Sequence, residues 1–133
     1  MKKILVILGI LLMLLYSGCT TGNYTSSWSK EINTFSRMSM SYKNFNGYKQ
    51  TKITVKAGEP VNVNAEFVSE EGKIGLSITD QDGNSFYQGT DIPTSSFAVK
   101  LDKKGEYTIK VSAENHKGEY KITWSREDKD KDK

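Results

Sequence analysis

Apolar and polar residues alternate with a period of two over most of the chain, from residue 37 to residue 125. Residues 61–67, for example, read Val-Asn-Val-Asn-Ala-Glu-Phe, so that one face of this segment is apolar and the other is polar. Such alternation is typical of a β-strand with one buried face. Turn-forming residues interrupt it about every 8 to 12 positions, which is the rhythm of a β-sandwich or barrel.

The pattern predicts eight strands and no helix in this region. The predicted strands span residues 38–42, 50–55, 61–67, 74–79, 85–88, 97–101, 107–113 and 120–124. The predicted turns lie at 46–47, 57–60, 70–73, 82–83, 89–95, 102–105 and 114–118, where Gly, Pro, Asn and Asp gather. Because each strand has one apolar face, two antiparallel sheets packed face to face would bury all of them. We therefore expect an all-β domain over 37–125, an eight-stranded antiparallel β-sandwich.

The start of the chain has a different pattern. Lys2 and Lys3 precede residues 4–15, which are all apolar or Gly. This run is shorter than the roughly 20 apolar residues that a helix needs to cross a bilayer. A basic start followed by a short apolar run is typical of a signal peptide, which we place at residues 1–18.

The segment that ends this run, Leu-Tyr-Ser-Gly-Cys at residues 15–19, resembles the lipobox of bacterial lipoproteins. Ser17, Gly18 and Cys19 match the pattern, whereas Tyr16 stands where the family usually has Leu. The resemblance implies cleavage before Cys19 and a diacylglycerol on its sulfur, with acyl chains such as palmitate. Two or more acyl chains hold a protein firmly on a membrane, so the resemblance implies a lipid-anchored protein on the extracytoplasmic face of the cell membrane.

The segments that flank the predicted domain are polar. Small polar residues dominate 20–29, so we expect residues 19–36 to comprise the lipidated Cys and a flexible tether. Tyr24 and Trp28 interrupt this polarity, and they would lie either at the membrane interface or against the domain. Residues 126–133 alternate acidic and basic side chains without apolar content, which predicts a disordered tail.

Residues 101–111, Leu-Asp-Lys-Lys-Gly-Glu-Tyr-Thr-Ile-Lys-Val, resemble a pattern found in bacterial pre-peptidase C-terminal domains. The pattern is a turn that ends in Gly, then a Tyr, then alternating aliphatic residues, and it also occurs in other jelly-roll-like sandwiches. The resemblance implies a jelly-roll-like fold in which Gly105 makes the turn and Tyr107 enters the core. Such domains are usually accessory units beside an enzyme, or binding modules.

Charge and composition argue against two classes of function. The formal net charge of the chain is +3, and the basic residues are interspersed with acidic ones, so we expect no nucleic-acid partner. The single Cys excludes an internal disulfide. Nucleophilic catalysis needs a base beside a nucleophile, but His116 is the only His and is expected in a loop, while Glu70 and Glu71 lie in a predicted turn. We therefore expect a protein that is not an enzyme.

Aromatic residues near turns are the first candidates for ligand binding. Phe45 and Tyr48 flank the predicted turn at 46–47. Phe86 and Tyr87 are adjacent, so they face opposite sides of their strand. Exposed rings would stack on sugars or anchor a protein partner, whereas packing against the core is the alternative.

Oxygen-bearing side chains at alternate positions are the second group. Asp80, Asp82 and Asn84 have the spacing found in calcium-binding loops. The Asp-Gly hairpin turn at 82–83 accounts for the same residues without a metal. We expect no cofactor other than a calcium ion at this loop.

These features predict a membrane-anchored, non-catalytic surface protein that binds a glycan, a wall polymer or a protein partner. A structural accessory subunit of an envelope complex is one alternative. A calcium-dependent binding module is the other, and it depends on Asp80, Asp82 and Asn84.

Overall fold

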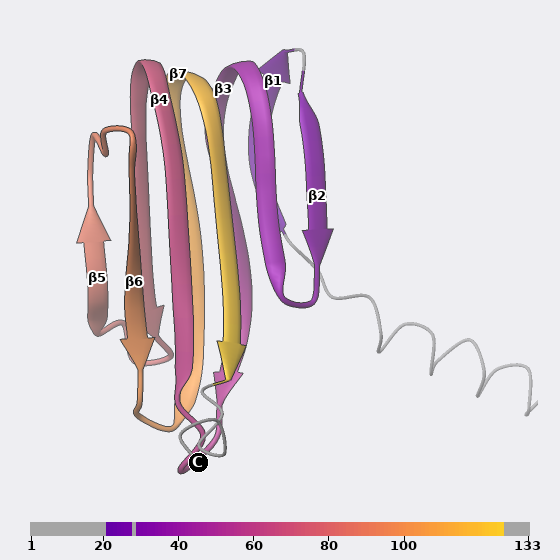
Figure 1. Ribbon diagram of the computed structural model, residues 1–133. Coiled ribbons are helices and arrows are strands. Elements are labelled where there is room, and N and C mark those ends of the chain that lie inside the picture. The colour runs from indigo at the N-terminus through magenta and orange to yellow at the C-terminus, as the bar shows by residue number, and fades with distance from the viewer. Residues whose placement is uncertain (1–20, 28, 127–133) are drawn as a thin grey trace, which may run out of the picture.

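The computed structural model describes residues 21–27 and 29–126, and these residues form seven β-strands (Figure 1). The strands are β1 (Thr21–Ser27), β2 (Lys30–Thr34), β3 (Arg37–Val55), β4 (Val61–Asp80), β5 (Ser85–Gly89), β6 (Ser95–Leu101) and β7 (Gly105–Arg126). The described residues contain no helix, and hence none that could cross a membrane. The predicted signal peptide, Cys19 and residues 127–133 lie outside the described part.

Three long strands, β3, β4 and β7, each pass through both layers of the fold. They curve over together at the top of Figure 1, and β7 lies between β3 and β4 in both layers. The front layer consists of β2, residues 37–42 of β3, residues 118–126 of β7, residues 61–69 of β4, and β6. The back layer consists of β1, residues 45–55 of β3, residues 105–116 of β7, residues 74–80 of β4, and β5. All strand pairs are antiparallel.

The level at which these three strands turn from one layer into the other is here called the bend. The register of β3 shifts between Tyr42 and Gly47, and that of β4 shifts between Ser69 and Lys73, as in β-bulges. Gly47 and Gly72 have positive φ angles of 113° and 74° at this level, and a Cβ at Gly72 would collide with the carbonyl oxygen of Asn115. Glycine therefore allows both the dihedral angle and the close approach of neighbouring strands.

The bend corrects the predicted number of strands. The turns expected at 46–47, 70–73 and 114–118 lie within continuous strands. Six predicted strands therefore join into three, the other two predicted strands correspond to β5 and β6, and β1 and β2 raise the total to seven. The all-β, antiparallel prediction is confirmed, and the count of eight is wrong because a glycine with positive φ serves a bulge as well as a hairpin turn.

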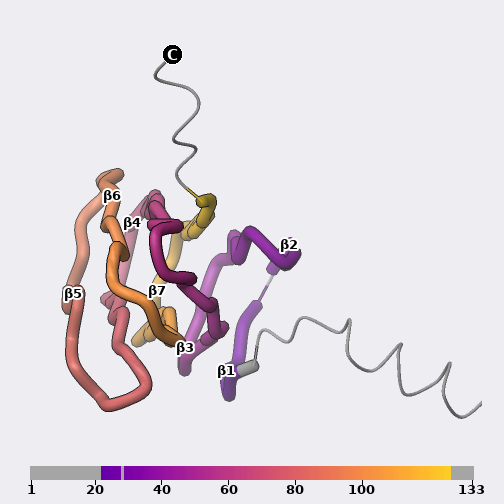
Figure 2. Tube along the Cα trace, turned by 90° about the horizontal axis from the view of Figure 1, so that it is seen from below, coloured from indigo at the N-terminus to yellow at the C-terminus, as the bar shows by residue number. Residues whose placement is uncertain are grey.

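The expected flexible tether at 19–36 is also corrected. Residues 21–27 and 30–34 pair with β3, in the back and front layers respectively. Figures 1 and 2 show β1 and β2 at one lateral edge of the sandwich, and β5 and β6 at the other. Edge strands need only one paired neighbour and bury little surface, so their sequences can stay polar and lack the alternation that marks other strands.

The core fills the space between the two layers. The apolar members of the alternating pattern face inward, as predicted, and Tyr107 is 1% exposed next to Ile109 and Val111. Met38, Met40 and Tyr42 are buried in the front half of β3 in the same way. Full burial of a large apolar side chain contributes roughly 1.5–3 kcal/mol, so this interior is the main source of stability.

A polar cluster closes the edge formed by β1 and β2. The Lys49 ammonium is almost completely buried, forms an ion pair with Glu31 of β2, and lies 4.0 Å from the centre of the Tyr24 ring of β1. The Tyr24 hydroxyl donates a hydrogen bond of 3.2 Å to Glu31. Burial alone would raise the pKa of Glu31, but hydrogen bonds from Lys49, Asn33 and Tyr24, with the charge of Lys49, lower it. The cluster thus joins both edge strands to β3.

Replacement of Gly72 by Ala tests the bend. Gly72 and Gly58 have nearly the same φ angle, 74° and 75°, but a Cβ at Gly58 would have no atom within 4 Å. Gly58→Ala therefore carries only backbone strain, about 1 kcal/mol, whereas Gly72→Ala adds a collision with β7 and should cost about 3 kcal/mol or more. Urea denaturation of both variants measures the difference. Equal losses would show that the close approach at the bend is unimportant.

Candidate binding groove

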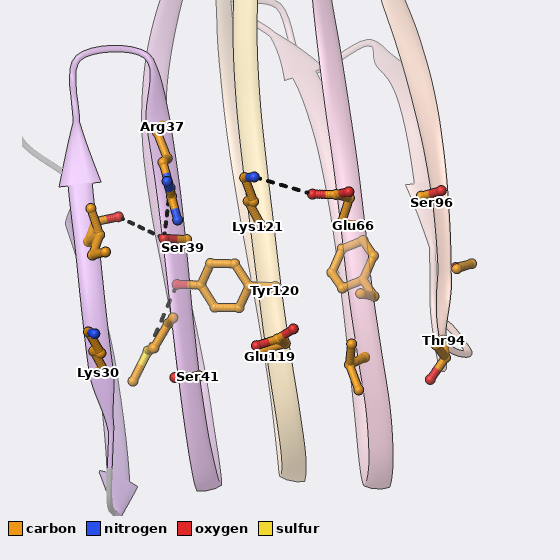
Figure 3. Close-up of a pocket in the computed structure, with 15 residues that line it drawn as sticks. Lys30, Arg37, Ser39, Ser41, Glu66, Thr94, Ser96, Glu119, Tyr120 and Lys121 are labelled. Atoms are coloured by element: carbon orange, nitrogen blue, oxygen red, sulfur yellow. Dashed lines mark hydrogen bonds and ion pairs between the residues drawn. The ribbon is translucent and has the colours of Figure 1, made fainter.

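A groove of about 640 Å³ lies on the outer face of the front layer (Figure 3). Its floor consists of outward-facing residues of three neighbouring strands, and β2 and the start of β6 form its sides. The floor residues are Ser39 and Ser41 of β3, Glu119 and Lys121 of β7, and Glu66 and Val68 of β4. They face outward because their neighbours along each strand are buried in the core, and side chains alternate between the two faces.

Hydrogen bonds hold one side of the floor in place. The Arg37 side chain donates from Nε to Ser39 Oγ at 3.1 Å, and Ser39 Oγ donates to the carbonyl oxygen of Ile32 at 3.2 Å. The floor also contains a cross-strand ion pair between Lys121 Nζ and Glu66 Oε2 at 3.6 Å. Figure 3 shows these two side chains extended toward each other from β7 and β4. The groove therefore rests on a rigid sheet with partly ordered side chains.

The groove carries both signs of charge and many hydrogen-bonding groups. Lysine and arginine side chains, two glutamates and several serine hydroxyls line it. Its aromatic lining residues, Tyr120 and Phe67, are 1% and 2% exposed because their rings belong to the core. The described lining thus offers hydrogen bonds and charge to a ligand rather than an aromatic surface for stacking.

A second polar site, centred on His116, lies at the bend. His116 is fully buried within β7 and not in the loop that we expected. Its Nδ1 lies 2.6 Å from the Tyr42 hydroxyl, and its Nε2 lies 2.9 Å from the Ser69 hydroxyl. A neutral imidazole needs one donor and one acceptor, and the two hydroxyls can supply both. Burial lowers the pKa of His116, so the neutral form is favoured.

This site differs from the triads of serine hydrolases. In those enzymes a carboxylate orients the ring and stabilises the imidazolium that forms. Here the hydroxyl of Tyr42 faces Nδ1, and burial raises the pKa of that hydroxyl, with a smaller contribution from Glu119. A buried neutral imidazole between two hydroxyls satisfies polar groups at the bend.

The predicted aromatic residues are not brought together. Phe45 is fully buried, with ring centres 5.0 Å from Tyr42 and 5.8 Å from Tyr24, so it offers no surface to a ligand. Tyr48 is half-buried on β3, with the Lys110 ammonium 4.6 Å from its ring centre. The core packing that we gave as the alternative therefore applies to Phe45.

Phe86 and Tyr87 lie on β5, separated from Tyr48 by β7 and β4. Phe86 packs edge-on against Tyr107 at 5.0 Å, and Tyr87 stacks on Phe97 at 4.9 Å. Both are half-buried against the core. The pair on β3 and the pair on β5 thus occupy separate parts of the molecule.

The predicted calcium ligands form a hairpin turn. Asp80 Oδ1 accepts hydrogen bonds from the backbone NH groups of Asp82 and Asn84 at 3.0 and 2.8 Å, and Oδ2 accepts one from Asn84 Nδ2 at 3.0 Å. The side-chain hydrogen bond from Asn84 is the largest cause that lowers the pKa of Asp80. Within the described residues, no three His, Cys, Asp or Glu side chains are placed to hold a metal ion. Both carboxylate oxygens serve the turn, and calcium binding stays a prediction.

The groove could not be predicted from the sequence. Its floor residues are the polar half of the alternating pattern, which looks the same for any solvated sheet face. They come from residues 39–41, 66–68 and 119–121, and only the order of the strands brings these segments together. The burial of Lys49, outside the groove, could have been predicted, because Lys49 lies in the same alternating phase as the inward-facing residues Thr51, Ile53 and Val55.

No family model matches the chain, and no curated protein matches it in sequence. Among solved structures it is similar to a CBM4 domain, with 8% identity and a TM-score of 0.44 over 84% of this chain and 81% of the other. It is similar to TmCBM61 in complex with β-1,4-galactotriose, with 16% identity and a TM-score of 0.45 over 84% and 90%. It is also similar to a family 29 carbohydrate-binding module, with 11% identity and a TM-score of 0.43 over 83% of this chain and 79% of the other. The likeness to these β-sandwiches concerns the fold alone.

The titration of His116 should make stability depend on pH. The unfolded chain binds a proton at the ordinary histidine pKa of 6.5, whereas buried His116 resists protonation to a lower pH. The unfolded state therefore binds more protons in this window. The free energy of unfolding should decrease as pH falls below 6.5, and the full contribution of neutral His116 to stability should be present above that pH. Urea midpoints between about pH 7 and about pH 5.5 would measure the slope.

The variant His116→Gln is the control, because its amide keeps hydrogen-bonding capacity but does not titrate. It should be less stable than the parent, with a flatter dependence on pH across the same window. Glu31, the half-buried carboxylate whose pKa is lowered, loses its contribution to stability only as pH falls below its ordinary value of 4.5. Identical slopes for parent and variant would contradict a role for His116.

Proposed function

We propose that this protein is a lipid-anchored, non-catalytic binding module on the extracytoplasmic face of the membrane, and that its groove binds an extended polar ligand, a glycan or a wall polymer. The observation that carries this proposal is the groove itself: hydrogen-bonding and charged side chains from neighbouring strands line one continuous surface. Its volume, about 640 Å³, is within the usual range of ligand sites.

The chemistry of the lining favours a polyhydroxylated polymer over a protein partner. Hydroxyl groups of a glycan both donate and accept hydrogen bonds, and Ser41, Glu119 and Lys121 offer complementary groups on one face. Protein interfaces depend on buried aromatic or Arg anchors, whereas the aromatic rings beneath this groove face the core and the Nε of Arg37 already donates to Ser39. The rigid sheet lowers the entropic cost of ordering these side chains on binding.

The anchor in this proposal rests on the start of the chain. Residues 4–15 form the short apolar run, and Cys19 ends the segment that resembles a lipobox. Acyl chains on Cys19 would keep the groove at the cell surface, where extended polymers are accessible.

Two matched double variants test the groove. Glu66→Ala with Lys121→Ala removes the ion pair of 3.6 Å on the floor of the groove. Lys52→Ala with Glu106→Ala removes another exposed ion pair, of 3.5 Å, on the opposite face, in the back layer. Exposed ion pairs contribute only about 0–1 kcal/mol to stability, so both variants should fold.

We expect the groove variant to bind purified cell-wall polymer at least about tenfold more weakly, because charged groups make the stronger hydrogen bonds. The back-layer variant should bind like the parent. Co-sedimentation of the full detergent-solubilised chain with wall material, and binding to a glycan array, are the measurements. Equal binding by parent and groove variant, or no binding by the parent to any polymer, would refute the proposal.

A further inference from the structure

The sandwich begins very close to the residue that would carry the lipid. Only Thr20 separates Cys19 from the first residue of β1, Thr21. Each residue of an extended chain spans at most about 3.6 Å, so the start of β1 lies within about 7 Å of Cys19. With Cys19 at the bilayer surface, the domain has no long tether, and one part of it must lie at the membrane.

The part in question is the lateral edge that contains β1 and β2. Both strands pair with β3, β1 in the back layer and β2 in the front layer. Figure 2 shows this edge, here called the anchor edge, on the side opposite β5 and β6. A chain held at the start of β1 therefore brings β2 and its hairpin close to the same surface.

Apolar side chains project from the anchor edge. Three large apolar side chains are exposed among the described residues: Phe35 at 88%, Ile32 at 41% and Val68 at 37%. Ile32 belongs to β2, and Phe35 lies in the turn between β2 and β3. Two of the three are thus on the anchor edge, where contact with lipid would remove them from water.

The rest of the fold holds the Phe35 turn in place. The indole Nε1 of Trp124 donates to the carbonyl oxygen of Phe35 at 3.0 Å, and the backbone NH of Trp124 donates to that of Ser36 at 3.1 Å. These two bonds fix the turn to β7. Phe35 is therefore held outward by a braced turn and is not exposed at the end of a loose loop.

The charge of the anchor edge also suits a membrane surface. The two strands contain a single carboxylate, Glu31, and it forms an ion pair with buried Lys49. Lys30, on the same strand as Ile32, is exposed. Anionic lipid head groups attract basic residues near them and repel carboxylates.

We propose that the anchor edge lies on the membrane surface, with Phe35 and Ile32 in the head-group region. This inference rests on the lipid anchor of the proposed function, and it adds an orientation. The groove, whose side is formed by β2, then opens beside the bilayer and runs up from it.

Lipid-borne quenching tests this orientation in the full lipidated chain. Thr34→Cys puts a unique thiol beside Phe35, and Gln88→Cys puts one on β5 at the far edge; both sites are exposed, and Cys19 is blocked by lipid. Each variant is labelled with a small fluorophore and reconstituted on vesicles of phosphatidylethanolamine and phosphatidylglycerol that carry spin-labelled head groups. We expect the label at 34 to lose most of its fluorescence and the label at 88 to keep it.

A matched pair of substitutions connects the quenching to Phe35. Phe35→Asp, in the chain labelled at 34, should abolish the quenching, because a carboxylate leaves the anionic surface. Val68→Asp, at the exposed apolar residue away from the anchor edge, should leave it unchanged. Flotation of each sample with the vesicles is measured first.

The outcomes separate this inference from the proposed function. A chain that does not float with vesicles overturns both the anchor and the orientation. A chain that floats but shows equal quenching at 34 and 88 overturns the orientation and leaves the anchor intact. Protection of the label at 34 from a soluble quencher, without quenching by lipid, would show that a second copy or another protein covers the anchor edge. That result would also overturn the proposed orientation.

Discussion

The bend shared by β3, β4 and β7 is the constraint on which the structure depends. It turns one sheet back on itself, so that the same three strands supply both layers and their apolar faces meet in one core. Glycines at 47 and 72 allow the strands to turn, and His116 joins the hydroxyls of Tyr42 and Ser69 across the same level. Without the bend, the sheet would stay open, expose its apolar face to water and be prone to aggregation.

Much of the core could be predicted from the sequence, because the side-chain period of a strand directly determines which residues face inward. Val61, Ile109 and Tyr107 were placed in this way. The continuity of the strands could not be predicted, since a glycine at position 47 or 72 is equally suited to a hairpin turn and to a bulge. The choice depends on how residues far away in sequence pair, which local pattern does not contain.

The candidate site was less predictable, for two physical reasons. Aromatic residues near a predicted turn suggested exposure, but Phe45 lies within the bend and therefore packs where the two layers meet. Groove residues such as Ser41 and Glu119 have no distinctive sequence signature, and they acquire meaning only because β3 and β7 are neighbours. The edge strands β1 and β2 were missed for a related reason. Their side chains Tyr24 and Glu31 contact Lys49 of β3, so these strands pack on a charged group and need no apolar face.

The central place of the last strand has a consequence for how the protein is made. β7 lies between β3 and β4 in both layers, so until residues 105–126 have been synthesised these two strands can pair only with their short edge partners, β1 and β2 or β5 and β6. Before that point only hairpins at the edges can form, and isolated hairpins are marginally stable in water. An incomplete chain would therefore stay largely unfolded until β7 has been synthesised. In the function proposed above the chain crosses a membrane before it folds, and delayed folding would suit that step.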